Sequence, residues 1–159
     1  MKIRIIGIGK IKEPYLKEGI AEYIKRISSY ASVEIIEVKD EPIKEKPSLS
    51  EITKAIDTEG ERVMKLLKPT DYVISLDLHQ KQLNSEEFAR FLDEKLAKSG
   101  ANLTFIIGGS YGLSNELKNR ANSVLTLSEL TFLHQMTRLI LLEQIYRAFK
   151  ILNNETYHK

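Results

Sequence analysis

Two segments in the last third of the chain have residue types and spacing suited to chemistry. The first is the glycine pair Gly108-Gly109, which directly follows the apolar run 103–107. The second is the polar segment 128–136, which follows another short apolar run at 123–127. Glycine at the exit of a strand lets a ligand approach the backbone, which a side chain would block. The sequence therefore predicts a small-molecule pocket where two neighbouring strands end.

Four further side chains near the end of the chain could stabilise charge or accept a proton. His134 and Arg138 are one helical turn apart on one face of a predicted helix, and Tyr157 and His158 stand near the carboxyl terminus. A guanidinium can stabilise a developing negative charge or hold a phosphate, and histidine can accept a proton near neutral pH. The residues leave open whether His134 or His158 is the base. A surface ion pair for Arg138 and a disordered tail are the structural alternatives.

Composition excludes several classes of function. The chain has 159 residues and no cysteine, which excludes disulfides and thiolate chemistry. The three histidines have no metal-ligand spacing, so we expect no metal. The segment Gly7–Lys10 lacks the spacing of a phosphate-binding loop. No apolar run approaches the roughly 20 residues of a membrane span, and the first residues lack the pattern of a signal peptide. We therefore expect a cytoplasmic protein without a membrane partner.

Charge is unevenly distributed along the first 60 residues. Residues 1–30 hold seven Lys and Arg against three Glu, a net of +4, whereas residues 31–60 hold eight acids against four lysines, a net of −4. A basic segment suits contact with phosphate. The structural alternative is a solvated helix face.

Apolar periodicity predicts strands that alternate with helices along the whole chain. The predicted strands are 2–8, 33–38, 72–78, 103–107 and 123–127, and the predicted helices are 13–30, 50–67, 84–99, a short one from Ser114, and 133–152. Ser50 or Thr53 is the expected cap of the second helix, and Asn84 with Glu87 resembles a capping box. This pattern indicates a single α/β domain, 1–159, with a mainly parallel sheet covered by helices on both faces.

The last predicted helix is apolar on every side around Leu139–Leu142. A helix that covers one face of a sheet needs only one apolar stripe. The extra apolar surface predicts a homodimer, and the alternative is a helix buried within a single core.

Taken together, the motifs of the chain resemble those of the RlmH family, which comprises small SPOUT-type methyltransferases of the bacterial large ribosomal subunit. The resemblance covers the whole chain and follows Phe105–Leu113, Leu127–Met136, Arg138, Glu143–Ala148 and Tyr157–Lys159, with support from Ile6–Lys12, Glu59-Gly60 and Val73–Leu78.

This resemblance implies a SPOUT (alpha/beta-knot) fold, in which the carboxyl-terminal segment forms a trefoil knot. It also implies S-adenosylmethionine (S-adenosyl-L-methionine) as cofactor, bound in a bent conformation at the knot. The implied substrate is a pseudouridine, position 1915 in helix 69 of 23S rRNA, which is methylated at N3 in the assembled ribosome by a homodimer. A methyltransferase acting on tRNA and a non-catalytic ribosome-binding factor are the alternatives.

Positions that match the family motifs imply the site residues. The cofactor would be bound by Leu76, Gly108, Leu127, Ser128, Glu129, Leu130, Thr131 and Phe132. The resemblance implies that the tail with Tyr157 and His158 folds over the pocket, and the basic loop Lys10–Lys12 is expected to touch RNA phosphate. One departure is Leu133, where the family usually has proline, and the substitution should loosen the start of the last helix.

Overall fold

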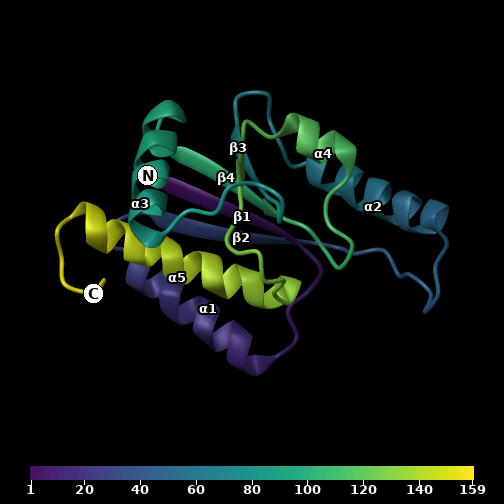
Figure 1. Cartoon of the computed structure of the whole chain (residues 1–159), viewed down its shortest axis with the longest axis horizontal. Coiled ribbons are helices and arrows are strands. Elements are labelled where there is room, and N and C mark those ends of the chain that lie inside the picture. Colours follow the sequence, from purple (N-terminus) through teal and green to yellow (C-terminus); the bar gives the residue numbers. More distant parts are fainter.

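The computed structural model describes all residues, 1–159, and it places a five-stranded sheet between two layers of helices (Figure 1). Every strand pair is parallel, and the order across the sheet is β2-β1-β4-β3-β5. The strands are β1 (Lys2–Ile8), β2 (Ser32–Val38), β3 (Tyr72–Leu76), β4 (Asn102–Ile107) and β5 (Ser123–Leu125). The helices are α1 (Pro14–Ile27), α2 (Leu49–Met64), α3 (Ser85–Lys98), α4 (Asn115–Arg120) and α5 (His134–Leu152). The predicted α/β class and parallel sheet are confirmed.

Alternating side chains of β1, an inner strand of the sheet, enter two separate cores. Ile3 and Ile5 belong to a large core that also contains apolar residues of α1, α3 and α5. Ile6 and Ile8 belong to a smaller core with residues of α2 and α4. Since successive side chains of a strand point to opposite faces, a strand covered on both faces reads as a continuous apolar run. This is why the first eight residues read as a buried strand.

Local hydrogen bonds account for where the helices begin. Asn84 and Glu87 form the predicted capping box, in which each side chain accepts from the backbone N–H of the other at 2.8 Å. The predicted cap of α2 was wrong: Ser48, and neither Ser50 nor Thr53, begins that helix and forms a capping box with Glu51. A Ser-x-x-Glu pattern satisfies two backbone donors at once, which favours Ser48 over its neighbours.

Two strands end earlier than their apolar runs predict. β3 stops at Leu76 because the Asp77 carboxylate accepts from the Leu78 N–H at 2.6 Å and turns the chain. β5 stops at Leu125, before the end of the predicted strand 123–127. The residues released from these strands become loop residues at the carboxyl edge of the sheet.

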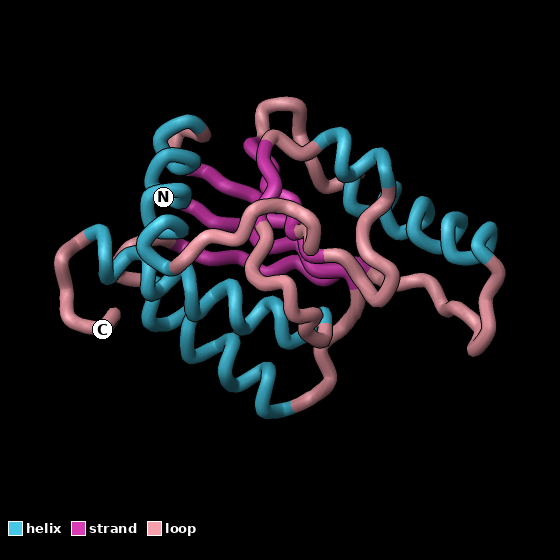
Figure 2. The backbone as a smooth tube through the Cα atoms, in the orientation of Figure 1, coloured by secondary structure: helices cyan, strands magenta, loops and turns pink.

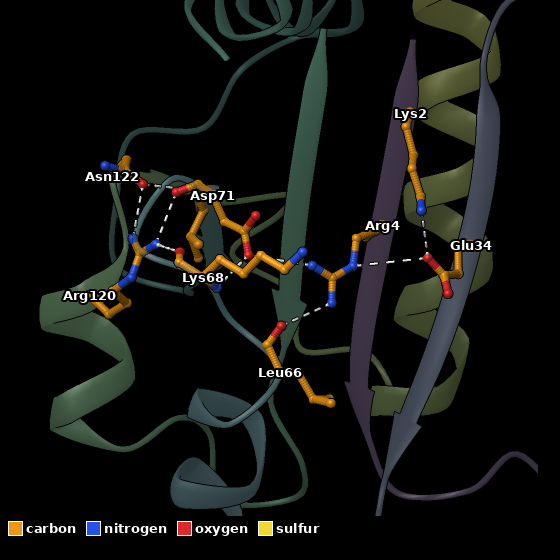
Figure 3. A network of polar contacts seen from close by, with 9 residues as sticks. Lys2, Arg4, Glu34, Leu66, Lys68, Asp71, Arg120 and Asn122 are labelled. Atoms are coloured by element: carbon orange, nitrogen blue, oxygen red, sulfur yellow. Dashed lines mark hydrogen bonds and ion pairs between the residues drawn. The ribbon is translucent and has the colours of Figure 1, made fainter. Parts of the chain in front are cut away.

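A network of polar contacts joins the elements at the amino-terminal edge of the sheet (Figure 3). Arg120 donates to the carbonyls of Lys68 and Asp71, each at 2.9 Å, and to the Asn122 side chain at 3.2 Å. Arg4 of β1 reaches the Asp71 carboxylate at 3.4 Å. These contacts tie the turn before β3 to β1, to α4 and to the start of β5.

Loops gather at the opposite, carboxyl edge (Figure 2). The segment that leads from β5 to α5 lies against the loop that leaves β3: Leu125 accepts from Asp77 N–H at 3.0 Å, and Thr126 Oγ1 accepts from Gln80 N–H at 3.0 Å. α5 then packs beside α1 and α3 on the other side of this crossing (Figure 1). The crossing brings two segments that are about 50 residues apart in the sequence to one place.

No helix has the combined length and apolarity that crossing a membrane requires.

Candidate functional site

A cavity of about 740 Å³ lies at the carboxyl edge, between the loops that follow β3, β4 and β5. This is where ligands bind in parallel α/β sheets, and the volume is typical of small-molecule sites. Nine of its twenty lining residues are hydrophobic, and the others are glycines and residues with polar or charged side chains.

Seven of the eight residues predicted to bind a cofactor line this cavity. They are Leu76, Gly108, Leu127, Ser128, Leu130, Thr131 and Phe132. The eighth, Glu129, is exposed and does not line the cavity. Its neighbours form a tight turn in which Leu130 N–H donates to Ser128 Oγ at 3.0 Å, and this turn excludes the Glu129 side chain from the cavity.

The two glycines after β4 shape their own loop. A Cβ on Gly108 would lie 2.8 Å from the Gly112 carbonyl carbon, and a Cβ on Gly109 would lie 3.3 Å from the Ile8 side chain. Gly112 has a φ of +87°, which favours glycine. The pair therefore has a structural role in addition to the predicted one of leaving backbone open to a ligand. Gly108 is required first for closure of the 108–112 turn, and the closed turn forms one wall of the cavity.

A buried carboxylate supports this turn from below. Glu59 of α2 is 6% exposed, lies within 4 Å of a Cβ position on Gly109, and accepts from Glu41 N–H at 2.9 Å. Burial is the main cause that raises the pKa of Glu59, and the nearby Asp40 carboxylate adds to the effect. Glu59 thus holds the loop after β2 next to the turn after β4.

His134, the first residue of α5, lines the cavity and is half-buried. Its Nε2 lies 3.5 Å from a Cβ position on Gly9, so the ring packs against the loop that follows β1. Burial lowers the pKa of His134, and the positive charge of Arg138 lowers it further. The imidazole is therefore neutral at neutral pH, as proton acceptance requires.

Arg138 lies outside the cavity and is completely buried. Its guanidinium donates to the Glu37 carboxylate at 2.9 Å and to the carbonyls of Ile8 and Gly9 at 3.1 and 2.6 Å. In the single chain Arg138 therefore contacts neither a ligand in the cavity nor bulk solvent. In the single chain, Arg138 is therefore not placed for direct charge stabilisation, and it does not form a surface ion pair. Its buried guanidinium instead holds the loop after β1 through hydrogen bonds.

The carboxyl terminus lies beside the last turns of α5 (Figure 1), and Tyr157 and His158 contact Glu143 and Arg147 of that helix. Arg147, which contacts His158, follows His134 by thirteen residues, or roughly 20 Å along the helix axis. The chain's own tail thus does not cover its own cavity, which corrects that expectation for the isolated chain. It is not frayed either, because Tyr157 packs edge-on against Tyr146 with ring centroids 4.8 Å apart.

The tail is held by two residues of α5 that the sequence analysis left without a role. Glu143 accepts from Tyr157 Oη at 3.0 Å and from Arg147 Nη2 at 2.6 Å, and Arg147 Nη1 lies 3.2 Å from His158 Nδ1. Burial raises the pKa of Tyr157, so its hydroxyl stays protonated and donates. The i,i+4 spacing of Glu143 and Arg147 was the available signal for this cluster.

The cavity also contains polar residues that sequence reasoning missed. Asp77, His79, Lys118 and Thr137 line it. Asp77 directs its carboxylate to the backbone of its own loop, at 2.6 Å from Leu78 N, whereas Lys118 forms no ion pair. The structure contains no group of three or more His, Asp or Glu side chains arranged to hold a metal ion.

Together the parallel sheet, the crossing of two loops and a cavity with mixed apolar and polar walls define an α/β protein with a candidate small-molecule site at the carboxyl edge. Comparison with known proteins gives the family. A family model described as "Predicted SPOUT methyltransferase" matches residues 1–158. The chain belongs to this SPOUT methyltransferase family, and its α/β fold is therefore of the SPOUT type.

Relatives of equal length agree with this assignment. A protein named ribosomal RNA large subunit methyltransferase H from Carboxydothermus hydrogenoformans is 55% identical over 159 residues, which is all of both chains. Proteins of the same name from Streptococcus pneumoniae and Streptococcus agalactiae are 50% and 46% identical, again over the full length of both. A probable methylase family protein from Haemophilus influenzae shares the fold, with a TM-score of 0.51 and 16% identity over 96% of this chain and 66% of its own.

Proposed function

We propose that this protein uses S-adenosylmethionine to methylate N3 of a pseudouridine in 23S rRNA, at position 1915 in helix 69 of the large ribosomal subunit. The observation that carries the proposal is the cavity at the carboxyl edge, lined by the loops that follow β3, β4 and β5, in a chain of the SPOUT methyltransferase family. The names of three full-length relatives support ribosomal RNA as the substrate. Such a substrate also accounts for a cytoplasmic protein.

The residues of the cavity fit the proposed cofactor. Leu76, Leu130 and Phe132 offer apolar walls for an adenine ring, and the backbone of 127–132 offers donors and acceptors for its edge. The sulfonium of the cofactor carries an already activated methyl group. The protein therefore has mainly to align the acceptor nitrogen, exclude water and manage one proton.

The proton in question is the one on N3 of the target base, which needs an acceptor at neutral pH. His134 lies in the cavity and is neutral there. His158 is the other candidate, and Arg147 holds its ring in place through Nδ1. Tyr157 adds an aromatic face on which a base could stack. Lys10 and Lys12, both exposed on the loop beside His134, are placed for RNA phosphates.

We propose further that two copies of the chain complete the site. Four large apolar side chains surround the cavity and stay exposed in the single chain: Leu78 (44%), Tyr111 (48%), Leu130 (72%) and Leu133 (51%). An exposed apolar rim is typical of an interaction surface. A two-fold arrangement with antiparallel α5 helices would cover the rim and bring the partner's tail, with Tyr157 and His158, over the cavity.

Methyl transfer to defined RNA tests the proposal. Calorimetry should first detect S-adenosylmethionine binding to the wild-type protein. Tritium from the labelled methyl group should then enter ribosomes from cells lacking the gene, and mass spectrometry should locate it in helix 69. Incorporation into bulk tRNA alone would show that the substrate is a tRNA and not 23S rRNA. Absence of cofactor binding would favour a non-catalytic ribosome-binding factor and refute the enzymatic proposal.

A further inference from the structure

Gly7 of β1 makes room for the buried Arg138. Gly7 faces α5, and its register partner on the neighbouring strand is Glu37. A Cβ at Gly7 would lie 2.5 Å from Arg138 Cζ and 2.8 Å from Nη2, distances that real side chains do not tolerate. The guanidinium therefore lies flat on β1 at the one position without a side chain and reaches across to Glu37.

From this position Arg138 and Glu37 fasten the loop that leaves β1. Arg138 donates to the carbonyls of Ile8 and Gly9, and one oxygen of Glu37, Oε2, accepts both from Arg138 at 2.9 Å and from Ile11 N–H at 2.8 Å. Gly9, with a φ of +97°, also donates to the Val38 carbonyl at 2.8 Å. The loop is thus held at several consecutive backbone groups, although it has no regular secondary structure.

The fastened loop presents two free positive charges. Ile11 is 5% exposed and packs into the large core, whereas Lys10 and Lys12 on either side of it are exposed and form no ion pair. His134, which packs on Gly9, connects this loop to the cavity. The backbone from which the two lysine side chains project is therefore held in place beside the site.

We infer that Gly7, Glu37 and Arg138 form a positioning unit that holds Lys10 and Lys12 in the geometry needed to contact phosphates of the substrate RNA. The inference rests on the proposed function, since it concerns the same substrate. Arg138 acts through the loop and does not touch the RNA.

Physical reasoning favours this role over simple stabilisation. The Arg138–Glu37 pair contributes little net stability, because desolvation of the buried guanidinium offsets its attraction to the partly exposed Glu37, and the Nε of Arg138 is buried without a partner. What the pair does supply is a fixed loop conformation. Fixing the loop before binding lowers the entropy lost when the lysines meet phosphate. A lysine in place of Arg138 has no planar fork that could reach three oxygens at once.

The experiment compares Arg138→Met with the double variant Lys10→Gln/Lys12→Gln and with the triple variant that combines them. The matched control is Arg120→Met, since Arg120 also donates to two backbone carbonyls and one side-chain oxygen, but at the opposite edge. For each protein we would measure the KM and kcat of methyl transfer to ribosomes lacking the methyl group, the ribosome Kd as a function of salt, the Kd for S-adenosylmethionine, and the Tm.

Replacing both lysines should weaken ribosome binding and reduce the slope of log K against log salt by about 2, roughly one per lost phosphate contact. Arg138→Met should raise the ribosome Kd and KM about tenfold, with a smaller change in kcat and little change in cofactor affinity. In the double-lysine background the same substitution should add nothing, because the groups it positions are gone. Arg120→Met should lower Tm without changing KM.

Two outcomes would overturn the inference. One is an undiminished effect of Arg138→Met in the double-lysine background, and the other is an equal effect of Arg120→Met on KM. Should Arg138→Met not fold, Glu37→Leu removes the carboxylate that accepts from Arg138, at a side chain that is 37% exposed. Glu37→Leu is then compared in the wild-type and double-lysine backgrounds in the same way. Gly7→Ala should reproduce the loss. If wild-type protein transfers no methyl group to ribosomes, the proposed function itself fails, and this is measured first.

Discussion

Arg120 and Arg138 make the same kind of contact at opposite edges of one sheet. Each guanidinium donates to two backbone carbonyls and to one side-chain oxygen. Beside Arg120, Arg4 pairs with Asp71 (Figure 3), whereas the Lys68 ammonium forms no ion pair. Beside Arg138, Lys10 and Lys12 also form no ion pair. Both edges thus keep unpaired lysines, but only those beside Arg138 lie on a loop that contacts His134 of the cavity.

The cavity follows the same division. No residue of the network around Arg120 lines it, whereas the loops after β3, β4 and β5 form its walls. Loops at the carboxyl edge thus contribute binding surface, and loops at the amino-terminal edge contribute stability. If this comparison is right, changes at the two edges should affect different measurable quantities.

The largest expected effect comes from removing the tail. Deletion of Tyr157–Lys159 should lower the rate of methyl transfer by a factor of about 100 or more, because it removes a stacking face and a candidate base. Cofactor affinity should change little, since the cavity walls are complete without residues 157–159. Filter-binding transfer assays and calorimetry measure the two quantities. Full activity in the truncated protein would contradict the role of the tail.

Mixing tests whether the tail acts on the partner's site. A truncated chain with an intact cavity should be inactive alone, and a full-length chain with Gly108→Ala should have low activity alone when S-adenosylmethionine is kept well below the weakened Kd of that variant. Mixed dimers should recover part of the activity if the tail of one chain serves the cavity of the other. No recovery, with dimers shown to exchange subunits, would place the tail and the cavity in the same chain.

Much of the carboxyl edge was predictable from the sequence, and the reason is local. Apolar runs predict strands, Asn84 and Glu87 predict a helix start, and a Gly-Gly pair after a strand predicts a special turn. The eight predicted cofactor residues came instead from the resemblance to the RlmH family, and seven of them line one cavity. The Ser48 cap of α2 was also available as a Ser-x-x-Glu pattern, but two later hydroxyl residues competed with it.

The roles of Arg138 and of the tail were not predictable in this way. That Arg138 is buried depends on Gly7 and Glu37 being register partners on two strands, and such pairing is a property of the assembled sheet. Helical spacing placed Arg138 beside His134 but could not tell which of its neighbours would accept its hydrogen bonds. The direction of the tail depends on the length of α5, which carries it away from the cavity.

The next largest effect is a difference in cofactor affinity between substitutions at two glycines, one at each edge of the sheet. Gly108→Ala should weaken S-adenosylmethionine binding at least tenfold, because its Cβ would lie 2.8 Å from the backbone of Gly112 and would reshape the cavity wall. Gly100→Ala, at the amino-terminal edge, meets no atom within 4 Å but must hold a φ of +65°. It should cost about 1 kcal/mol of stability and leave cofactor affinity unchanged. Calorimetry and thermal unfolding distinguish the two, and equal cofactor affinity in both variants would contradict the comparison.

A smaller effect concerns pH. The folded protein lowers the pKa of His134, so the unfolded chain binds the proton more readily. Stability should therefore fall as pH drops from the unfolded value, about 6.5, towards the lower folded value. His134→Asn removes this acid sensitivity. The difference in Tm between wild type and variant should shift by about 2 °C between pH 7.5 and pH 5.5, to the disadvantage of the wild type in acid. An unchanged difference would show that the ring is not held neutral.

The smallest effect is expected where α5 leaves the carboxyl edge. Leu133 precedes the helix with a φ of −55°, donates no backbone hydrogen bond and caps nothing with its side chain. Proline prefers φ near −65° and lacks the N–H, so Leu133→Pro fits the backbone as it stands. The variant should gain about 0.5 kcal/mol by restricting the unfolded chain, with unchanged kcat. Thermal unfolding measures the gain. A loss of stability or of cofactor affinity would mean that the loop before α5 needs the freedom that leucine gives it, and that this part of the carboxyl edge is not preformed.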